Sequence, residues 1–238
     1  MENRRKRRTK VDIENCIMEV ATKIIEEKGF AELKVTEIAR QAQIEPIVFY
    51  NRYADLTEFV DEYVKKYDYW FSDIVSEYKN TLDKQEKHNK LLASLFESLL
   101  QNEVMQQLLR WELATNNDTT KRTARLREFH TMPLSDEYSC LFSDSQIDIV
   151  AISALIVGGL YYLILHKDLA PFSNIDINTP EGKARIEKAT IYLSDLLFTE
   201  KSKKNEIEIV AKKMKHRGID MEIIAECTGL SVSLIERL

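Results

Sequence analysis

Apolar residues recur every three to four positions along most of this chain, which is the spacing of one face of an α-helix. Between residues 11 and 28, Ile13, Ile17, Val20 and Ile24 follow this spacing, and Gly29 then ends the pattern. The 238 residues include only 6 Gly and 4 Pro, too few for the many turns of an all-β protein. No alternating run requires a strand. The sequence therefore predicts an all-α fold.

The same periodicity divides the chain into expected helices. They cover residues 11–28, 35–42, 46–53, 57–79, 87–101, 103–115, 119–130, 146–167 and 181–199. Thr179 suits the N-cap of the last of these helices, and Pro180 suits its first turn. Residues 131–145 and 168–180 contain three of the four prolines, so we expect them to form loops.

Charge is distributed unevenly along the chain, although the formal net charge is only −5. Residues 54–200 hold 15 Lys and Arg against 24 Asp and Glu, whereas residues 1–53 hold 11 against 9 and residues 201–238 hold 8 against 6. Six cations lie close together before the first helix: Arg4, Arg5, Lys6, Arg7, Arg8 and Lys10. A basic arm of this kind favours contact with nucleic acid, which the total charge does not suggest.

Cysteine usage and hydropathy indicate a cytoplasmic protein without a membrane span. Cys16, Cys140 and Cys227 lie too far apart for a disulfide framework or a metal knuckle. The basic N-terminal residues are not followed by an apolar segment, so they do not form a signal peptide. The most apolar stretch, residues 150–165, has 16 residues, whereas a span needs about 20. We expect it to be a core or interface helix.

No pattern typical of catalysis or metal binding stands out. The 4 histidines lack the spacing of metal ligands. The sequence shows no Ser-His-Asp order, paired carboxylate motif or glycine-rich phosphate loop. We therefore expect no enzyme activity, no metal site and no cofactor.

Residues 30–59 combine two short helices with a tight turn between them. A shared core would be formed by Val35, Ile38, Ala39, Ala42, Ile44, Val48 and Phe49. Because several of these side chains are small, the two helices can pack closely at a steep angle. Pro46, Ile47, Tyr50 and Asn51 would then point outward. This arrangement is typical of a helix-turn-helix, whose second helix lies in the major groove of DNA.

Residues 10–62 resemble the DNA-binding domain of the tetracycline-repressor (TetR) family of transcriptional regulators. That family has a first helix ending in Gly-Phe, a VxxIA core, an Ala-x-Val/Ile turn and a Leu/Phe-Tyr-x-x-Phe/Tyr ending. The matching residues here are Gly29-Phe30, then Val35, Ile38 and Ala39, then Ala42 and Ile44, and finally Phe49, Tyr50 and Tyr53. The sequence departs from the family at Lys34, Glu45, Ile47 and Leu56, where Thr, Ser, Gly and Lys are usual.

The resemblance implies a homodimeric transcriptional regulator, a repressor that binds a pseudo-palindromic operator in double-stranded DNA. A small apolar or aromatic ligand would release it from DNA, and helices 147–165 and 186–198 would form the dimer interface. The expected DNA contacts are Arg4, Arg5, Arg7, Arg8, Lys34, Pro46, Ile47, Tyr50, Asn51 and Arg52. The expected ligand contacts are Trp70, Met105, Trp111, Tyr161, Tyr162 and His166.

We expect four segments along the chain: a basic arm at 1–10, a helix-turn-helix domain at 11–55, a helical ligand-binding and dimerisation domain at 56–200, and an appendage at 201–238. Residues 224–235 repeat the helix-turn-helix pattern of residues 38–49. The appendage either contacts DNA or a partner, or only packs as a compact unit. A partner-binding scaffold, and a helical carrier or enzyme with a vestigial DNA-binding head, remain alternative functions.

The basic arm yields a direct test. Deleting residues 1–10 is expected to weaken DNA binding and to flatten its salt dependence, by roughly 0.9 in the log–log slope for each phosphate that the arm no longer neutralises. Affinity measured by fluorescence anisotropy across a range of salt concentrations checks this, and an unchanged slope would refute a role for the arm.

Overall fold

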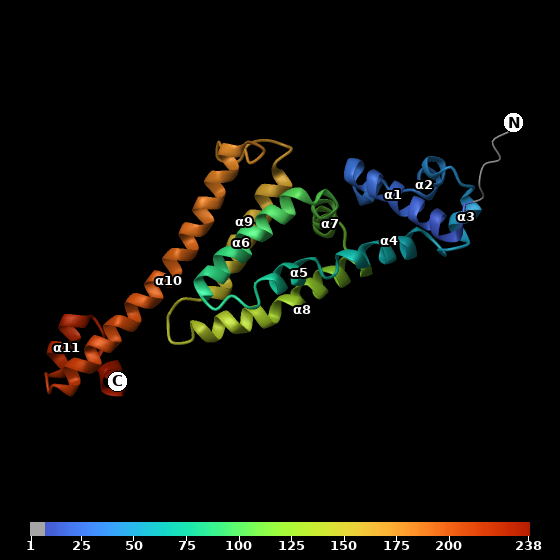
Figure 1. The fold of residues 1–238 in the computed structure, drawn as a ribbon. Helices are drawn as coiled ribbons and strands as arrows, with labels where there is room; N and C mark the ends of the chain where they lie inside the picture. Colours follow the sequence, from blue (N-terminus) through green and yellow to red (C-terminus); the bar gives the residue numbers. More distant parts are fainter. Residues whose placement is uncertain (1–7) are drawn as a thin grey trace.

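The computed structural model describes residues 8–238, and this part of the chain is all-α with no strand beyond one isolated bridge between Phe172 and Ile175 (Figure 1). The first helices are α1 (Lys10–Lys28), η1 (Phe30–Glu32), α2 (Val35–Ala42), α3 (Pro46–Tyr50), α4 (Leu56–Val64), η2 (Lys65–Tyr67) and α5 (Trp70–Glu77). They are followed by α6 (Lys84–Gln101), α7 (Glu103–Ala114), α8 (Asp118–Leu141), α9 (Ile149–His166), α10 (Pro180–His216), α11 (Met221–Thr228) and α12 (Val232–Arg237).

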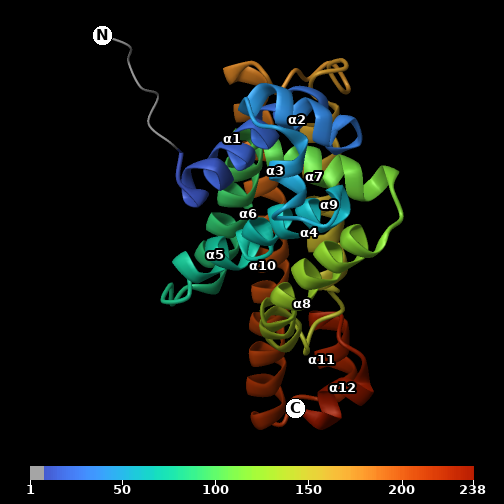
Figure 2. The same cartoon turned by 90° about the vertical axis from the view of Figure 1, so that its right-hand side faces the viewer.

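The molecule is elongated, with the start of α1 and the C-terminus at opposite ends (Figure 1). Helices α1–α4 form a head at one end, and α5–α9 with the first half of α10 form the body. Helices α11 and α12 pack beside the last turns of α10, far from the head in both views (Figures 1 and 2). We refer to these parts as the head, the body and the C-terminal unit.

One hydrophobic core runs from the head into the body. It joins Ile17 and Phe49 of the head to Leu95 on α6 and Leu160 on α9, all of which are at most 3 % exposed. The C-terminal unit has a separate core of only three buried residues, Ala211, Ile224 and Ile235. Head and body therefore fold as one continuous core, whereas the C-terminal unit is held mainly by its own small cluster.

The start of α10 is formed as its sequence predicts. Thr179 is the N-cap and its Oγ1 accepts a hydrogen bond from the backbone N–H of Gly182 at 3.1 Å. A Cβ added at Gly182 would lie 1.9 Å from the carbonyl oxygen of Asp176, so only glycine allows the preceding loop to pack this closely.

The helix expected over residues 57–79 is interrupted. It ends at Val64, continues as the 3₁₀ turn η2 and resumes as α5 at Trp70. Seven residues of continuous α-helix would separate Asp61 from Asp68 by about 10 Å along the axis. Instead, a single guanidinium, that of Arg122 on α8, contacts both carboxylates. Tertiary contacts with α8 thus stabilise the bend between α4 and α5.

The loop expected over residues 131–145 is largely helical. Helix α8 continues through Pro133 to Leu141, although proline in a helix interior removes one backbone hydrogen bond. Tyr138 and Phe142, which follow the proline, are buried against Ile149 and Phe198. Burial of these two aromatic side chains favours the continued helix over a break.

Helix α10 is also longer than expected, because it runs 37 residues to His216 rather than ending near residue 199. Lys201 Nζ donates to Asp144 Oδ1 at 2.9 Å, which links α10 to the α8–α9 loop where the helix leaves the body. From there α10 extends away from the body and carries the C-terminal unit (Figure 2).

Replacing Pro133 with alanine is expected to raise the free energy of unfolding by about 1–3 kcal/mol, since proline is about 3 kcal/mol less favourable than alanine inside a helix. Urea denaturation followed by circular dichroism measures this change. Asp136→Ala, at an exposed position on the same helix, serves as the control and should change stability by less than about 0.5 kcal/mol. Destabilisation by Pro133→Ala would contradict the expected strain at this position.

Burial of His88 predicts a pH dependence of stability. Its ring is 5 % exposed between α6, α9 and α10, where Nδ1 lies 2.7 Å from Ser194 Oγ and Nε2 lies 3.2 Å from Ser153 Oγ. Burial lowers the pKa of His88 from 6.5 to about 4. The unfolded chain therefore binds a proton at a higher pH than the folded chain does, and stability falls as the pH drops from 6.5 towards 4.

Between pH 7 and pH 5 this one group is expected to cost about 2 kcal/mol of stability. Urea titrations at the two pH values, on the wild type and on His88→Asn, isolate its share from that of other titrating groups. An equal decrease in both proteins would show that His88 does not carry it.

Candidate nucleic-acid interface and cavity

The two short helices of the head form a compact helix-turn-helix. Ile38, Ala39 and Ala42 of α2 are buried, and Phe49 is the buried residue of α3. Phe49 packs in turn on Phe59 of α4, with the ring centroids 5.4 Å apart. The inward face of α3 is therefore used by the core, and its other face is left to solvent.

The outward residues of α3 lie where the sequence places them. Ile47 is 63 % exposed and Tyr50 is 50 % exposed, and Pro46 and Asn51 are exposed as well. These four side chains are accessible together on one side of α3. This face combines an apolar group, a phenol and an amide, which are groups that contact thymine methyls, phosphates and adenine edges.

The cations expected at this surface differ in how they are held. Lys34 is exposed and lies 3.4 Å from Glu32. Arg52 is half-buried, and its guanidinium donates to the carbonyl oxygens of Val48 at 2.9 Å and Lys10 at 3.4 Å. Arg52 thus ties α3 to the start of α1.

Arg8 is the only expected DNA contact of the basic arm that lies within the described residues. Its Nη1 donates to the carbonyl oxygen of Ala42 at 2.7 Å, which anchors the end of the arm beside the last turn of α2. Arg4, Arg5 and Arg7 lie outside the described residues.

A cavity of about 780 Å³ lies between α7, α8 and α9. Its walls are mainly apolar. They include Leu109, Leu113, Ala114, Ala124, Gly158, Leu165 and Leu169 together with Tyr161, Tyr162 and His166. A volume of this size is in the range that holds a drug-sized molecule. Three of the six residues expected to bind a ligand, Tyr161, Tyr162 and His166, therefore line one cavity.

The other three expected ligand contacts lie elsewhere. Trp70 packs between α5 and α6, where its Nε1 donates to Ser98 Oγ at 2.9 Å. Met105 is 1 % exposed in the main core. Trp111 stacks on Phe30 with the ring centroids 5.0 Å apart. These three side chains do not line the cavity. Helical periodicity places aromatic and sulfur-containing residues in a core as readily as in a ligand site, so the sequence could not distinguish the two positions.

The cavity contains a buried ion pair that the sequence did not reveal. Arg127 on α8 forms a bidentate pair with Glu112 on α7, with N–O distances of 2.6 and 2.7 Å from Nη2. Thr123 Oγ1 donates to Glu112 at 2.7 Å. Nothing in the local sequence of either helix indicates that these residues meet. Since the two charges already satisfy each other, the cavity favours a largely uncharged guest.

Helix α7 connects this cavity to the head. Leu109, Glu112 and Leu113 line the cavity, whereas Trp111 contacts Phe30 at the start of η1 in the head. A shift of α7 would therefore change its contact with Phe30 in the head.

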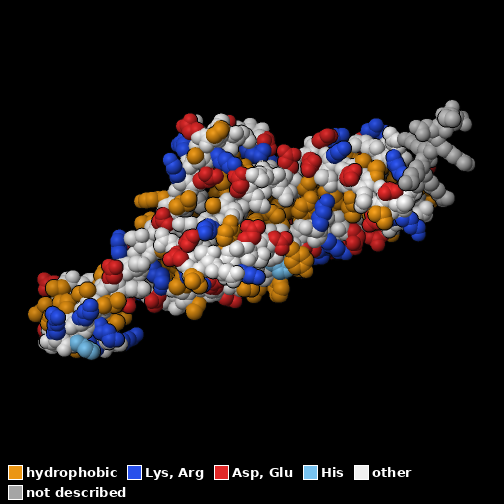
Figure 3. All heavy atoms as spheres, viewed as in Figure 1, with side chains coloured by type: hydrophobic (Ala, Val, Ile, Leu, Met, Phe, Trp, Pro, Cys, Tyr) orange, Lys and Arg blue, Asp and Glu red, His pale blue; other side chains and the backbone are white. Residues whose placement is uncertain are grey.

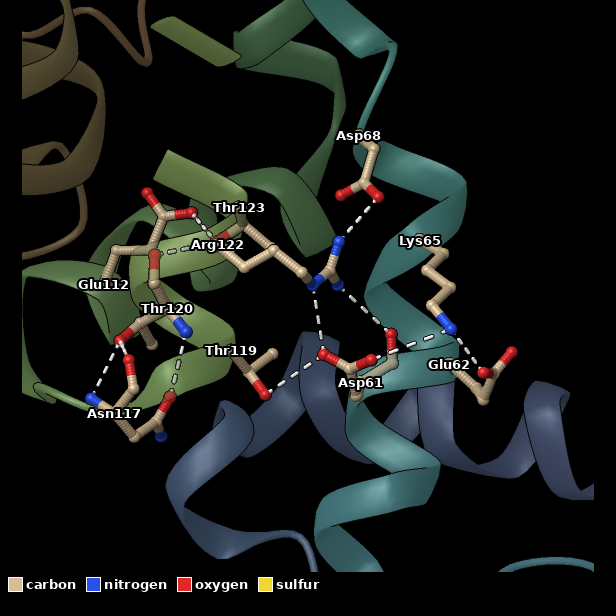
Figure 4. A network of polar contacts seen from close by, with 10 residues as sticks. All are labelled: Asp61, Glu62, Lys65, Asp68, Glu112, Asn117, Thr119, Thr120, Arg122 and Thr123. Carbon is tan, nitrogen blue, oxygen red and sulfur yellow. Dashed lines mark hydrogen bonds and ion pairs between the residues drawn. The ribbon is translucent and has the colours of Figure 1, made fainter. Parts of the chain in front are cut away.

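The start of α8 is bonded to the bend between α4 and α5 (Figure 4). Arg122 Nε lies 3.1 Å from Asp61 Oδ1, and Arg122 Nη1 lies 2.8 Å from Asp68 Oδ2. Thr119 Oγ1 also donates to Asp61, at 3.2 Å. The head is thus attached to the body by an apolar contact at α7 and a polar contact at α8.

Helices α9 and α10 present an unusually apolar exposed surface. On α9 the exposed residues recur at helical spacing: Ala151, Ala154, Leu155, Gly158, Gly159 and Tyr162. On α10 they include Ile191, Tyr192, Leu193 and Leu196. Within the described part of the chain, no atom outside their own stretch of helix lies within 4 Å of a Cβ built at Gly158 or Gly159, so another helix has room to approach closely there.

By length and composition alone, α9 could also cross a membrane. It is the only such helix among the described residues, with 18 residues, a mean hydropathy of 2.1 and 17 % of its residues buried. The helix is slightly longer than the 16-residue apolar stretch of the sequence. Its stripe of small residues also suits an interface between helices.

No protein-family model matches this sequence, and a comparison with curated proteins found no match. Solved structures do resemble it. One is a TetR-family transcriptional regulator from Mesorhizobium loti MAFF303099, with a TM-score of 0.55 and 16 % sequence identity over 80 % of this chain and 98 % of that chain.

A second is a transcriptional regulator from Rhodococcus sp. Rha1, with a TM-score of 0.55, 13 % identity, and coverage of 78 % of this chain and 96 % of that chain. A third is a TetR-family protein from Vibrio parahaemolyticus, with a TM-score of 0.53, 14 % identity, and coverage of 75 % and 96 %. The chain therefore has the all-α fold of TetR-family transcriptional regulators.

Proposed function

We propose that this chain is a TetR-family transcriptional regulator of the cytoplasm, a homodimeric repressor that a small apolar or aromatic ligand releases from its operator. The observation that carries this proposal is the exposed face of α3, where Ile47, Tyr50 and Asn51 project from a helix whose opposite side is buried. The likeness of the fold to known regulators supports it.

In this proposal α3 lies in the major groove. Asn51 bonds an adenine edge, Ile47 contacts a thymine methyl, and Tyr50 contacts a phosphate. Lys34 and the basic arm supply phosphate contacts that do not depend on sequence, with Arg4, Arg5, Arg7 and Arg8 as candidates. Arg52 contributes mainly by holding α3 in place, since its guanidinium is bonded within the head.

The apolar surface of α9 and α10 supports a homodimer. Two-fold symmetric contact would bury Leu155, Tyr192 and Leu196, which are between 42 and 77 % exposed in one chain. Gly158 and Gly159 would let the paired helices approach closely. Two heads are needed because a pseudo-palindromic operator presents two half-sites about 34–36 Å apart, or a multiple of this distance.

The cavity between α7, α8 and α9 is the proposed ligand site. Its apolar walls suit an uncharged apolar or aromatic molecule, with Tyr161, Tyr162 and His166 available for stacking. Because α7 contacts both the cavity and Phe30, occupancy of the cavity and binding of the operator would weaken each other reciprocally.

We also propose the division into an arm at 1–10, a helix-turn-helix DNA-binding domain at 11–55, a ligand-binding and dimerisation domain at 56–200 and an appendage at 201–238. The distance of the appendage from the head favours a role away from DNA (Figure 1). Hydrophobic side chains gather on its surface (Figure 3), including Ile209 and Ile223, which are 54 % and 52 % exposed. This exposure favours partner binding by the appendage as a second candidate function.

The recognition helix can be tested on the duplex that the wild-type chain enriches most strongly from random DNA. Asn51→Ala is expected to lower affinity for this duplex by about 1–3 kcal/mol and to relax the base preference at one position. Asn116→Ala, an exposed substitution of the same type between α7 and α8, is the matched control and should leave affinity unchanged. Equal affinities of Asn51→Ala and the control, measured by anisotropy, would exclude α3 as the recognition helix.

A further inference from the structure

Helix α8 has two functional faces. Ala124, Arg127 and Glu128 line the cavity between α7, α8 and α9. Thr119 and Arg122 contact the chain on another side, at the bend between α4 and α5. A single rigid element therefore touches both the cavity wall and the segment that joins the head to the body.

The contacts of Arg122 span the bend. Asp61 lies on α4 before the break, and Asp68 follows η2 after it. The Arg122 guanidinium donates to Asp61 Oδ1 at 3.1 Å, to the Asp61 carbonyl oxygen at 3.3 Å and to Asp68 Oδ2 at 2.8 Å (Figure 4). The planar, multidentate guanidinium can hold both carboxylates at once, whereas the ammonium of a lysine cannot match this geometry.

The Asp68 carboxylate depends strongly on this contact. Its side chain is only 10 % exposed, and among the described residues Oδ1 is buried with no hydrogen-bond partner. Removing Arg122 would leave a buried carboxylate without its compensating charge, which is among the costlier changes in a protein interior. The segment around residues 65–69 would then have to open towards water, and the bend would no longer have a fixed geometry.

The bend controls the placement of the head because α4 belongs to the head's core. Phe59 and Tyr63 on α4 pack against Phe49 and Phe30, at centroid distances of 5.4 and 6.2 Å. Any change in the angle between α4 and α5 therefore carries α3 with it.

We propose that Arg122 is the positioning residue that fixes the orientation of the head on the body, and that the Glu112–Arg127 pair couples the contacts of Arg122 with Asp61 and Asp68 to ligand binding in the cavity. The second part rests on the proposed ligand-controlled function. The positioning role of Arg122 does not rest on that function, because it concerns only the bend between α4 and α5.

The connection to the cavity runs through adjacent residues of α8. Thr123 follows Arg122 in sequence and donates to Glu112, which Arg127 also holds. A guest that displaces the joined Glu112–Arg127 pair as a unit also disturbs the contact made by Thr123. The start of α8, and with it Arg122, would then shift relative to Asp61 and Asp68.

Double electron–electron resonance on the full-length chain tests the first part. Spin labels are placed at Gln41→Cys on α2 and Lys90→Cys on α6, both exposed, with Cys16, Cys140 and Cys227 replaced by serine. Doubly labelled chains are diluted with unlabelled chains, so that only distances within one chain are measured. This readout requires neither DNA nor a ligand nor a dimer.

Arg122→Gln is expected to broaden and shift the distance distribution, and Arg125→Gln, an exposed arginine on the same helix, is expected to leave it as in the wild type. Arg122→Lys retains the charge and guards against simple unfolding. It should melt close to the wild type and still broaden the distribution. A wild-type distribution in folded Arg122→Gln or Arg122→Lys would overturn the proposal.

Glu112→Gln tests the connection to the cavity, since it weakens the ion pair while preserving side-chain shape. It is expected to shift the head in the same direction as Arg122→Gln and to lower affinity for the enriched duplex by about fivefold or more. An unshifted head would overturn the cavity link. Absence of DNA binding in the wild type would instead refute the proposed function and leave the distance result on Arg122 standing.

Discussion

The structure depends on the continuous apolar contact that seats the head on the body. Phe30 stacks on Trp111 and meets Tyr63 edge to face, and Thr22 Oγ1 lies 2.7 Å from the Tyr63 hydroxyl. Thr22 lies on α1, Phe30 on η1, Tyr63 on α4 and Trp111 on α7. The head therefore cannot move without disturbing α7, which also forms a wall of the cavity. The arrangement links the helix-turn-helix and the cavity between α7, α8 and α9 through one packed layer.

Much of the fold followed from helical periodicity and capping. The all-α fold, the short helices around residues 35–50 and the Thr179 cap are confirmed, because local sequence determines them. The orientation of Ile47 and Asn51 also agrees, since the buried side of α3 is set by Phe49.

The differences arise where distant residues override a local preference. Arg122 stabilises a break in a stretch whose periodicity alone predicts one helix. Tyr138 and Phe142 favour continuing α8 past Pro133, which locally predicts a loop. The Glu112–Arg127 pair joins residues of two helices through space, and no spacing in either segment indicates the contact. Only three of the six expected ligand residues line the cavity, because the sequence identifies aromatic side chains but does not show which space they face.

The charge pattern acquires a physical meaning in the structure. The head and the body each hold more acidic than basic residues, and the basic arm precedes α1, where Arg8 is bonded to the last turn of α2. Acidic helices of like charge to DNA and a basic arm would orient the molecule on a duplex with the arm foremost. The chain therefore combines a net acidic composition with a cluster of cations before its first helix.

Selection of bound sites from random double-stranded DNA tests the central claim most directly. The account predicts enrichment of inverted repeats whose half-site centres lie about 34–36 Å apart, or a whole multiple of this distance, as two heads on one dimer require. Recovery of no preferred sequence, or of a single unpaired site, would contradict it.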